Sequence, residues 1–215
     1  FIGFALLNFF YQYHLPIVWH PVLYWIVLLF GEDLLFWVEH FVDHSCRLFW
    51  AVHVTHHSSP EYNLSTGFRS SVFMPVYKYL YFIPLVLLNF QSKDIVFMYA
   101  ITQIWGILVH TQSIKKLPRW VEYIFVTPSH HRVHHASNIP YLDKNMGMLF
   151  IIWDRMFGTF EDERADDPVR YGTRAPVRSW NPLWINLDTF WALCKDAWRA
   201  RSWRDKLTIW WRAPG

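Results

Sequence analysis

The sequence predicts an all-α integral membrane protein, with about four transmembrane helices in two hairpins and a cytoplasmic helical cap. Apolar segments alternate with polar ones, and most histidines gather where the apolar segments end. Aromatic residues make up 20% of the chain and include 14 Trp, a residue type that concentrates at membrane interfaces. The net charge of only +3 gives no reason to expect a nucleic-acid partner, because such proteins carry a strong basic excess.

The first hairpin is expected from residues 1–13 and 21–38, with Pro16 and Pro21 bracketing the turn. Residues 1–13 are apolar but shorter than the roughly 20 residues that cross a bilayer. We therefore expect a segment before residue 1 to complete this span. Residues 21–38 are apolar down to Phe30, and the acids that follow at 32 and 33 mark where the helix leaves the hydrocarbon.

The second hairpin is expected from residues 72–90 and 95–110, joined by the polar turn Gln91–Asp94. Both segments are long enough to cross, or nearly cross, a bilayer. Pro75 and Pro84 should kink the first of them, because proline interrupts a helix. A buried helical hairpin of a soluble protein is the alternative interpretation.

The two hairpins place the histidine-rich segments on one side of the membrane. Of the 20 basic residues, 18 lie on that side, with Lys78 and Lys93 the exceptions, so the positive-inside rule makes it cytoplasmic. His14 and His20 fall at the opposite turn and are predicted to be interfacial and non-catalytic. We expect one domain, residues 1–215, with membrane helices at about 1–38 and 72–110 and a cap at about 39–71 and 111–215.

Three histidine clusters and one isolated histidine predict a metal site. Imidazole is the commonest protein metal ligand, and the members of each cluster are spaced to share one helix face. Nine candidates exceed the needs of one ion and suit two. Chance surface or core histidines are the alternative for any single one. The predicted ligands are His40, His44, His53, His56, His57, His110, His131, His134 and His135.

The helix that carries the first cluster should break before the second. In one straight helix His40 and His44 would point almost opposite to His53 and His57, because each residue turns the helix by about 100°. We therefore predict a break between Ser45 and Trp50, so that two helices converge on the metal.

Thr127 and Pro128 predict a helix start before the last histidine cluster, as N-cap and first helical residue. His130 and His134 are also four residues apart, so His130 is an alternative ligand, but it lies at the edge of the ligand arc and is predicted to lie outside the ligand set. The cysteines, Cys46 and Cys194, provide neither a disulfide framework nor an iron–sulfur motif. Cys46 lies between two clusters and could be a ligand, but a small buried side chain is the favoured interpretation.

Few carboxylates accompany the histidines, because the Glu-x-x-His motif of ferritin-like di-iron bundles is missing from the sequence. Asp43 is expected to orient the neighbouring His44 from behind the metal, and a solvated helix-end charge is the alternative. Arg69 and Arg132 are candidates for binding an anionic head group, with capping or salt bridges as the alternative.

The C-terminal segment, from Trp184 to Trp211, follows a polar loop at residues 161–179. Its apolar residues recur at helical spacing, and basic residues follow closely behind. This pattern is typical of an amphipathic helix on an anionic lipid surface. Packing against the cap is the alternative.

The order H-x3-H, H-x2-H-H, H-x2-H-H around membrane hairpins resembles the fatty acid hydroxylase/sterol desaturase superfamily over about residues 20–160. Finer matches resemble its alkylglycerol monooxygenase branch and bacterial relatives: H-H-S-S-P-E-Y-N-L-S-T-G-F-R at 56–69, T-P-S-H-H-R-V-H-H at 127–135, and L-D-K-N-M-G-M-L-F-I-I-W-D-R-M-F-G-T-F-E at 142–161. Three positions depart from the family pattern: Phe41 replaces an arginine, Ser45 an acidic residue, and Met146 the tyrosine of N-Y-G. Asn145 of this last motif joins Asp43 as a catalytic candidate.

The resemblance implies a membrane-bound, non-haem di-iron oxygenase that uses O2 to hydroxylate or desaturate a lipid C–H. In the alkylglycerol branch, hydroxylation beside the ether oxygen gives a hemiacetal that separates into an aldehyde and a glycerol. The implied cofactors are two Fe ions, with Zn possible after purification, and tetrahydrobiopterin or an external electron-transfer protein as reductant. The implied partners are a membrane lipid, O2 and that electron donor.

Three other functions compete with this expectation. The enzyme could act on another lipid, such as a sterol, a fatty acyl chain or an amino-acid-containing lipid. It could be a zinc-dependent hydrolase, because imidazole binds zinc well, although no H-E-x-x-H motif is present. A non-catalytic metal-binding or transport protein is the third, although transport would place ligands at mid-membrane.

Overall fold

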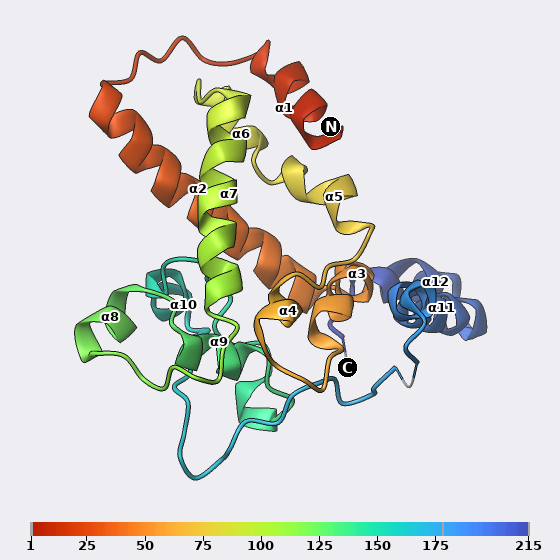
Figure 1. The fold of residues 1–215 in the computed structure, drawn as a ribbon. Coiled ribbons are helices and arrows are strands. Elements are labelled where there is room, and N and C mark those ends of the chain that lie inside the picture. Colours follow the sequence, from red (N-terminus) through yellow and green to blue (C-terminus); the bar gives the residue numbers. More distant parts are fainter. Residues whose placement is uncertain (1, 178, 215) are drawn as a thin grey trace.

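The computed structural model describes residues 2–177 and 179–214, and its regular structure is helical (Figure 1). Within these ranges no strand forms, and β-type pairing is limited to the isolated bridges Phe125–Phe150 and Ala136–Tyr171. The predicted all-α class is therefore confirmed. The long helices α2 (Pro21–Ser45) and α7 (Ser92–Leu108) cross at the centre of the molecule.

One end of the molecule is an apolar bundle of α1 (Ile2–Tyr11), α2, α6 (Ile83–Leu87) and α7. Its core contains Leu7, Leu28, Phe82, Leu85, Val86, Phe90, Ile95 and Met98. The outward faces of α2 and α7 are also apolar and exposed, at Val22, Trp25, Ile26, Phe97, Ile101 and Ile104. Among the described helices, α2 alone is both long and apolar enough to cross a membrane, with a mean hydropathy of 1.6 over its best window.

The first segment of the expected second hairpin is not one kinked helix. It divides into α5 (Met74–Tyr77), the 3-10 helix η1 (Lys78–Leu80) and α6. Pro75 and Pro84 each lie in the first turn of a separate helix, where the missing N–H costs nothing. The prolines therefore start new helical segments, and the prediction that they kink one continuous helix is wrong.

The predicted break between the first two histidine clusters is confirmed. Helix α2 continues past residue 38 to Ser45, and α3 (Arg47–His57) begins after Cys46. Cys46 has extended dihedrals, φ −128° and ψ 123°, so the chain changes direction there. The Cys46 thiol donates to the Trp210 carbonyl at 3.2 Å.

The opposite end of the molecule is the cap, built from α3, α4 (Leu64–Gly67), α8 (Arg119–Ile124), α9 (Pro128–His134), η2 (Ile139–Tyr141) and α10 (Ile152–Phe157). Thr127 caps α9 and Pro128 follows in its first turn, as predicted. Glu32 and Asp33, which are predicted to mark the edge of the hydrocarbon, are fully buried within the fold. The Asp33 carboxylate accepts the N–H groups of Leu149 and Phe150, at 2.8 and 3.1 Å, and so holds the cap against α2.

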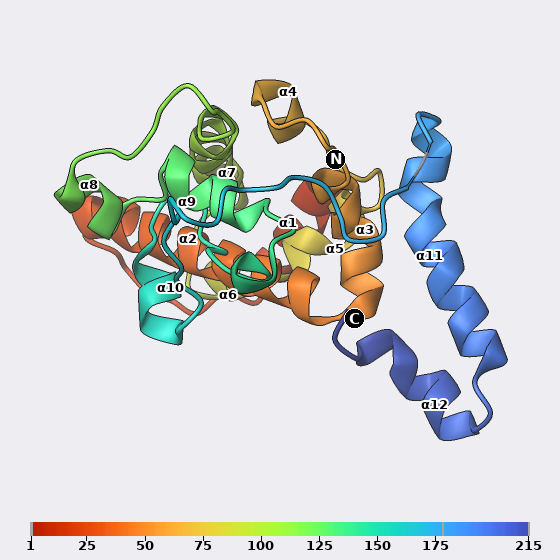
Figure 2. The same ribbon diagram turned by 90° about the horizontal axis from the view of Figure 1, so that it is seen from below.

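The C-terminal segment forms α11 (Pro182–Arg199), α12 (Trp203–Thr208) and the 3-10 helix η3 (Ile209–Trp211). Figure 2 shows α11 and α12 as an arm beside α3. Ala51 of α3 packs with Leu193, Ala197 and Ile209 in a small separate core. The segment therefore does pack against the cap, but through one face only.

Candidate metal centre

All nine predicted ligands come together in the cap, in two adjacent groups. In each group, one ligand atom per residue lies within 4.8 Å of every other. Four helices or their ends contribute: α2, α3, the end of α7 and α9. The first group is His40, His44, His53, His57 and His134, and the second is His56, His110, His131 and His135.

The imidazole Nε2 atoms of each group converge at distances that metal coordination requires. In the first group His53 Nε2 lies 3.1 Å from both His40 Nε2 and His57 Nε2. In the second, His110 Nε2 lies 3.0 Å from His131 Nε2 and 3.1 Å from His135 Nε2. Ligands about 2.1 Å from one ion are separated by about 3.0 Å in octahedral geometry and about 3.4 Å in tetrahedral geometry. The donor set therefore fits one metal ion in each group.

Acceptor groups of residues 143–146 contact Nδ1 atoms of the first group, on the side of each ring away from Nε2. His40 Nδ1 contacts the Met146 carbonyl at 2.7 Å, and His134 Nδ1 contacts the Lys144 carbonyl at 2.9 Å. His44 Nδ1 lies 3.1 Å from Asp143 Oδ1. Asp143 and Asn145 both have φ of 55°, a left-handed conformation that Asn and Asp tolerate better than most residues. This local twist brings three acceptors from four consecutive residues to three imidazoles.

The second group uses backbone carbonyls in the same way. His56 Nδ1 contacts the Arg69 carbonyl at 3.0 Å, and His110 Nδ1 contacts the Gly106 carbonyl at 2.7 Å. A carbonyl oxygen only accepts, so Nδ1 must carry the proton in these residues. Nε2 is then the unprotonated atom that a metal needs.

Burial keeps these imidazoles neutral. It lowers the pKa of His57, His134 and His135, and the neighbouring imidazoles lower it further. Burial also lowers the pKa of His56 to about 4. Metal ions bind neutral imidazole, so the site is poised for a cation at neutral pH.

Asp43 supports His53, whereas the sequence suggested His44. Its Oδ2 lies 3.5 Å from His53 Nδ1, and its Oδ1 accepts from the Tyr77 hydroxyl at 2.9 Å. The expected partnership with His44 is wrong in the structure, because Asp143 takes that place. Asp43 is buried, so the solvated helix-end alternative does not apply.

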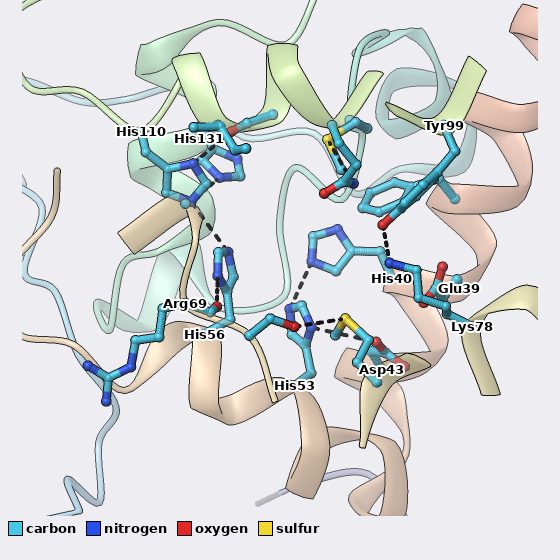
Figure 3. A pocket seen from close by; sticks show the side chains of 18 of the residues that line it. Glu39, His40, Asp43, His53, His56, Arg69, Lys78, Tyr99, His110 and His131 are labelled. Atoms are coloured by element: carbon cyan, nitrogen blue, oxygen red, sulfur yellow. Dashed lines mark hydrogen bonds and ion pairs between the residues drawn. The ribbon is translucent and has the colours of Figure 1, made fainter. Parts of the chain in front are cut away.

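A cavity of about 100 Å³ opens between the two groups on the side of the helical bundle (Figure 3). Imidazoles of both groups line it, as do Glu39, Lys78 and Tyr99. Lys78 Nζ contacts the Tyr99 hydroxyl, and Glu39 is buried with Oε2 unpartnered. The remaining lining is mostly apolar and includes Phe36, Met74, Ile107 and Met148.

A second cavity, of about 230 Å³, lies against other histidines of the two groups. His44, His57, His134 and His135 line it together with Trp50 and residues 172–175. The Trp50 ring contacts the imidazoles of His44 and His57, with centroid distances of 5.1 and 5.6 Å. The metal groups are therefore accessible from two separate cavities.

The other candidate residues make mainly structural contacts. Asn145 donates to the carbonyls of His130 and Glu161, at 3.1 and 2.8 Å, and so fixes α9. Arg132 donates to Glu163 and to the carbonyls of Thr111 and Ile114. Neither side chain lines the cavity between the groups.

Arg69 does line that cavity, but its guanidinium donates to the Thr55 carbonyl and the Ser58 hydroxyl, both at 2.8 Å. In Figure 3 it points away from the imidazoles. These contacts match the salt-bridge and capping alternative for both arginines. Catalytic or substrate-binding roles for Asp43, Asn145, Arg69 and Arg132 stay predictions.

Three histidines belong to neither group of the described residues. His130 lies 3.0 Å from the Glu122 carboxylate and accepts the Thr127 N–H at 3.3 Å. It therefore lies behind α9, outside the ligand groups. His14 and His20 are exposed at the connection between α1 and α2, at the far end of the molecule.

One buried acid with a role at the site was missed in the sequence. Asp154 accepts the N–H groups of Met146 and Gly147, at 2.7 and 2.8 Å, and also Trp37 Nε1 at 3.1 Å. It thereby fixes the peptide whose carbonyl holds His40. Asp154 lies in the segment 142–161 that resembles the alkylglycerol branch. No rule of residue spacing, however, connects Asp154 with His40.

Comparisons with known proteins agree with this geometry. A family model described as fatty acid hydroxylase matches residues 25–159. The alkylglycerol monooxygenase of Caenorhabditis elegans is 36% identical over 183 residues, covering 82% of this chain and 35% of the relative. The human alkylglycerol monooxygenase is 34% identical over 205 residues, covering 94% of this chain and 44% of the relative.

More distant relatives include the mouse lathosterol oxidase, which is 26% identical over 138 residues that cover 62% of this chain and 43% of the relative. No solved structure matches the chain at a significant level. The chain spans less than half the length of these curated relatives. The family match covers most of the chain and includes all nine clustered histidines, so the chain belongs to the fatty acid hydroxylase family.

Proposed function

We propose that the protein is an O2-dependent di-iron membrane oxygenase that hydroxylates a lipid C–H, with the ether-adjacent carbon of an alkylglycerol as the preferred target. The observation that carries this proposal is the convergence of nine buried or half-buried imidazoles into two groups beside one cavity that also has apolar side chains in its lining. The similarity to alkylglycerol monooxygenases supports the choice of lipid.

The first group would hold one iron ion and the second group the other. Two bound irons would supply the activation of O2 and the oxidation of the C–H bond. The protein's own contribution is to fix the imidazoles through Nδ1 and to shield them from water. Tyr77 would hold the Asp43 carboxylate by its hydrogen bond, and that carboxylate would keep its place 3.5 Å from His53 Nδ1.

The cavity between the groups would receive the lipid. Its apolar lining, from Phe36, Met74, Ile107 and Met148, suits an alkyl chain. Glu39 and Lys78 line the same cavity and would face the polar part of the molecule. The reacting carbon would then lie beside His40 and His53 on one side and His110 and His131 on the other.

The proposal includes a multi-pass membrane topology with the cap in the cytoplasm. Helix α2 has 25 residues and is about 38 Å long at 1.5 Å per residue, enough for a hydrocarbon core of about 30 Å. The exposed apolar faces of α2 and α7 would contact lipid. The bundle would therefore be the membrane part of a single domain, and residues 39–71 and 111–215 would form its cap.

Metal content and O2 uptake, measured on the same iron-supplemented protein, test the proposal. We expect two irons per chain and O2 uptake when an alkylglycerol and tetrahydrobiopterin are added. His134→Ala in the first group and His56→Ala in the second should each lower metal content and uptake. His14→Ala, at the exposed far connection, is the matched control and should change neither.

Other results would contradict parts of the proposal. Full metal retention in both His134→Ala and His56→Ala would refute the ligand assignment. One tightly held zinc, with ester cleavage in the absence of O2, would identify a hydrolase. Two irons with O2 uptake only on a sterol would favour the second candidate, a sterol oxidase or desaturase, which the similarity to lathosterol oxidase supports.

A further inference from the structure

Helix α11 has two apolar faces, and the fold covers only one of them. Leu193 and Ala197 are buried against Ala51 of α3. Trp184, Leu187, Trp191 and Trp198 are exposed by 42%, 40%, 55% and 84%. At about 100° per residue these four side chains form one stripe, roughly opposite Leu193. Large exposed apolar stripes mark surfaces that contact a partner or a membrane.

Contacts on either side of Leu193 show which edge of α11 faces the apolar bundle. About 20° from Leu193, in the rotation direction that leads to Leu187 and the stripe, Asn186 Oδ1 accepts the Val72 N–H at 3.2 Å, just before α5. Val72 and Val76 are themselves exposed by 70% and 64% and extend the apolar surface. On the other flank Thr189 lines the second cavity of the cap. The apolar stripe and the bundle are therefore on the same side of the molecule.

The charged residues of α11 lie on the cap side of the stripe. At about 100° per residue, Asp188, Lys195 and Arg199 form a narrow strip between Trp184 and Ile185, which is buried. Residues 182–214 contain six basic and three acidic residues. Two of the acids, Asp196 and Asp205, pair with Arg47 and Arg212. The basic excess therefore gathers at the end of α11 and in α12.

The direction of α11 also suits a surface position. In Figure 1, α11 is seen nearly end-on and α7 stands upright. In Figure 2, α7 is seen nearly end-on and α11 lies along the picture. Helix α11 therefore runs across the direction of α7. If α7 follows the membrane normal, α11 lies parallel to the membrane plane.

We propose that α11 and α12 form an interfacial element that binds the surface of an anionic bilayer. The tryptophan stripe enters the boundary between head groups and acyl chains, where indole rings concentrate. Arg199, Arg201 and Arg204 then bind lipid phosphates, which adds electrostatic attraction to apolar burial. Because α11 packs on α3, this contact braces the helix that carries three of the clustered histidines. The element lies beyond the matched family region, which ends at residue 159.

Spin labels on neighbouring residues test this placement in the full chain. Cys194→Ser removes the accessible cysteine, and Cys46 is buried. Leu187→Cys and Asp188→Cys then place a nitroxide on the stripe and on the charged strip, about 100° apart. In nanodiscs of phosphatidylcholine and phosphatidylglycerol we expect the ratio of O2 to nickel-complex accessibility to be severalfold higher at 187 than at 188. Replacing Arg199, Arg201 and Arg204 with Gln should reduce that ratio at 187.

The inference about α11 rests on the membrane placement of the proposed function. A label at Ile104→Cys, on the exposed face of α7, tests that placement separately. A lipid-exposed label at 104 with equal ratios at 187 and 188 would overturn the interfacial helix alone. A label at 187 that is shielded from both reagents would also overturn it and indicate a protein partner. Labels at 104 and 187 that both favour the nickel complex would refute the membrane placement itself.

Discussion

At the scale of single residues, the chemistry of the site depends on the groups that contact the Nδ1 atom of each imidazole. Five of the nine clustered histidines contact a backbone carbonyl or a carboxylate through Nδ1 at 3.1 Å or less, in addition to the longer His53–Asp43 contact. Such partners fix the tautomer and the ring orientation before any metal arrives. Most of these acceptors are carbonyls, which every residue has. The residue types at those positions therefore do not reveal, in the sequence, that their carbonyls orient the histidines.

The Glu122 carboxylate gives this residue-scale network a pH dependence. Burial alone would raise the Glu122 pKa, but hydrogen bonds from His130, the Leu117 N–H and Ser129 lower it from 4.5 to about 2. A carboxylate whose pKa is lower in the folded state stabilises the fold above its ordinary pKa. That stability is lost as the pH falls from about 4.5 to about 2.

Replacing Glu122 with Gln should therefore lower the thermal unfolding temperature most at neutral pH. The difference from the wild type should shrink progressively between about pH 4.5 and pH 2. Thermal unfolding followed by circular dichroism in detergent measures it. Glu61→Gln, on an exposed loop, is the matched control and should show no such trend. A constant difference across this range would mean that the carboxylate is not stabilised as described.

At the scale of elements, the close approach of α4 and α7 supports the second metal group. A Cβ at Gly67 would lie 3.0 Å from His110 Nδ1 and 3.1 Å from the Ile107 Cα. The second contact is with backbone, so α7 itself would have to move. The absence of a side chain at Gly67 therefore lets α4 pack directly beside a candidate ligand.

Gly67→Ala should destabilise the fold by about 1–3 kcal/mol, the usual cost of overpacking. It should also displace His110 and lower the metal content of the second group. Thermal unfolding and elemental analysis on one preparation would measure both effects. Gly31→Ala is the control, because its nearest neighbour is a terminal methyl of Leu85, 2.9 Å away, which can rotate aside. Equal metal content in the two variants would show that α4 does not position His110.

Local rules predicted the elements well where a single residue decides the backbone. The break at Cys46 followed from the need of four imidazoles to face one point, and the α9 start followed from Thr127 and Pro128. The same rules did not show whether Pro75 would bend a helix or start one, because that depends on the tertiary contacts of α5. The contacts of Asp154 and Asp143 were not predicted, because Asp154 contacts Trp37 and Asp143 contacts His44, which are 117 and 99 positions away in the sequence.

At the scale of the whole molecule, the arrangement separates an apolar end from a metal-binding end. The connection between α1 and α2 lies at one end, and the histidine groups lie at the other (Figure 1). Helix α2 joins the two, since it carries Leu28 in the apolar core and His44 in the first group. A chain built this way would expose its ends to opposite sides of a bilayer.

Accessibility to a membrane-impermeant maleimide would therefore differ between the two ends. We replace Tyr13, exposed at the α1–α2 connection, or Asp166, exposed in the cap, with Cys in the Cys194→Ser background. In intact cells Tyr13→Cys should react, and Asp166→Cys should react only after permeabilisation, because the predicted hairpins place 18 of the 20 basic residues on the cap side. The reverse pattern would place the cap outside the cell. Reaction of both only after permeabilisation would mean that α2 does not carry the chain across the membrane.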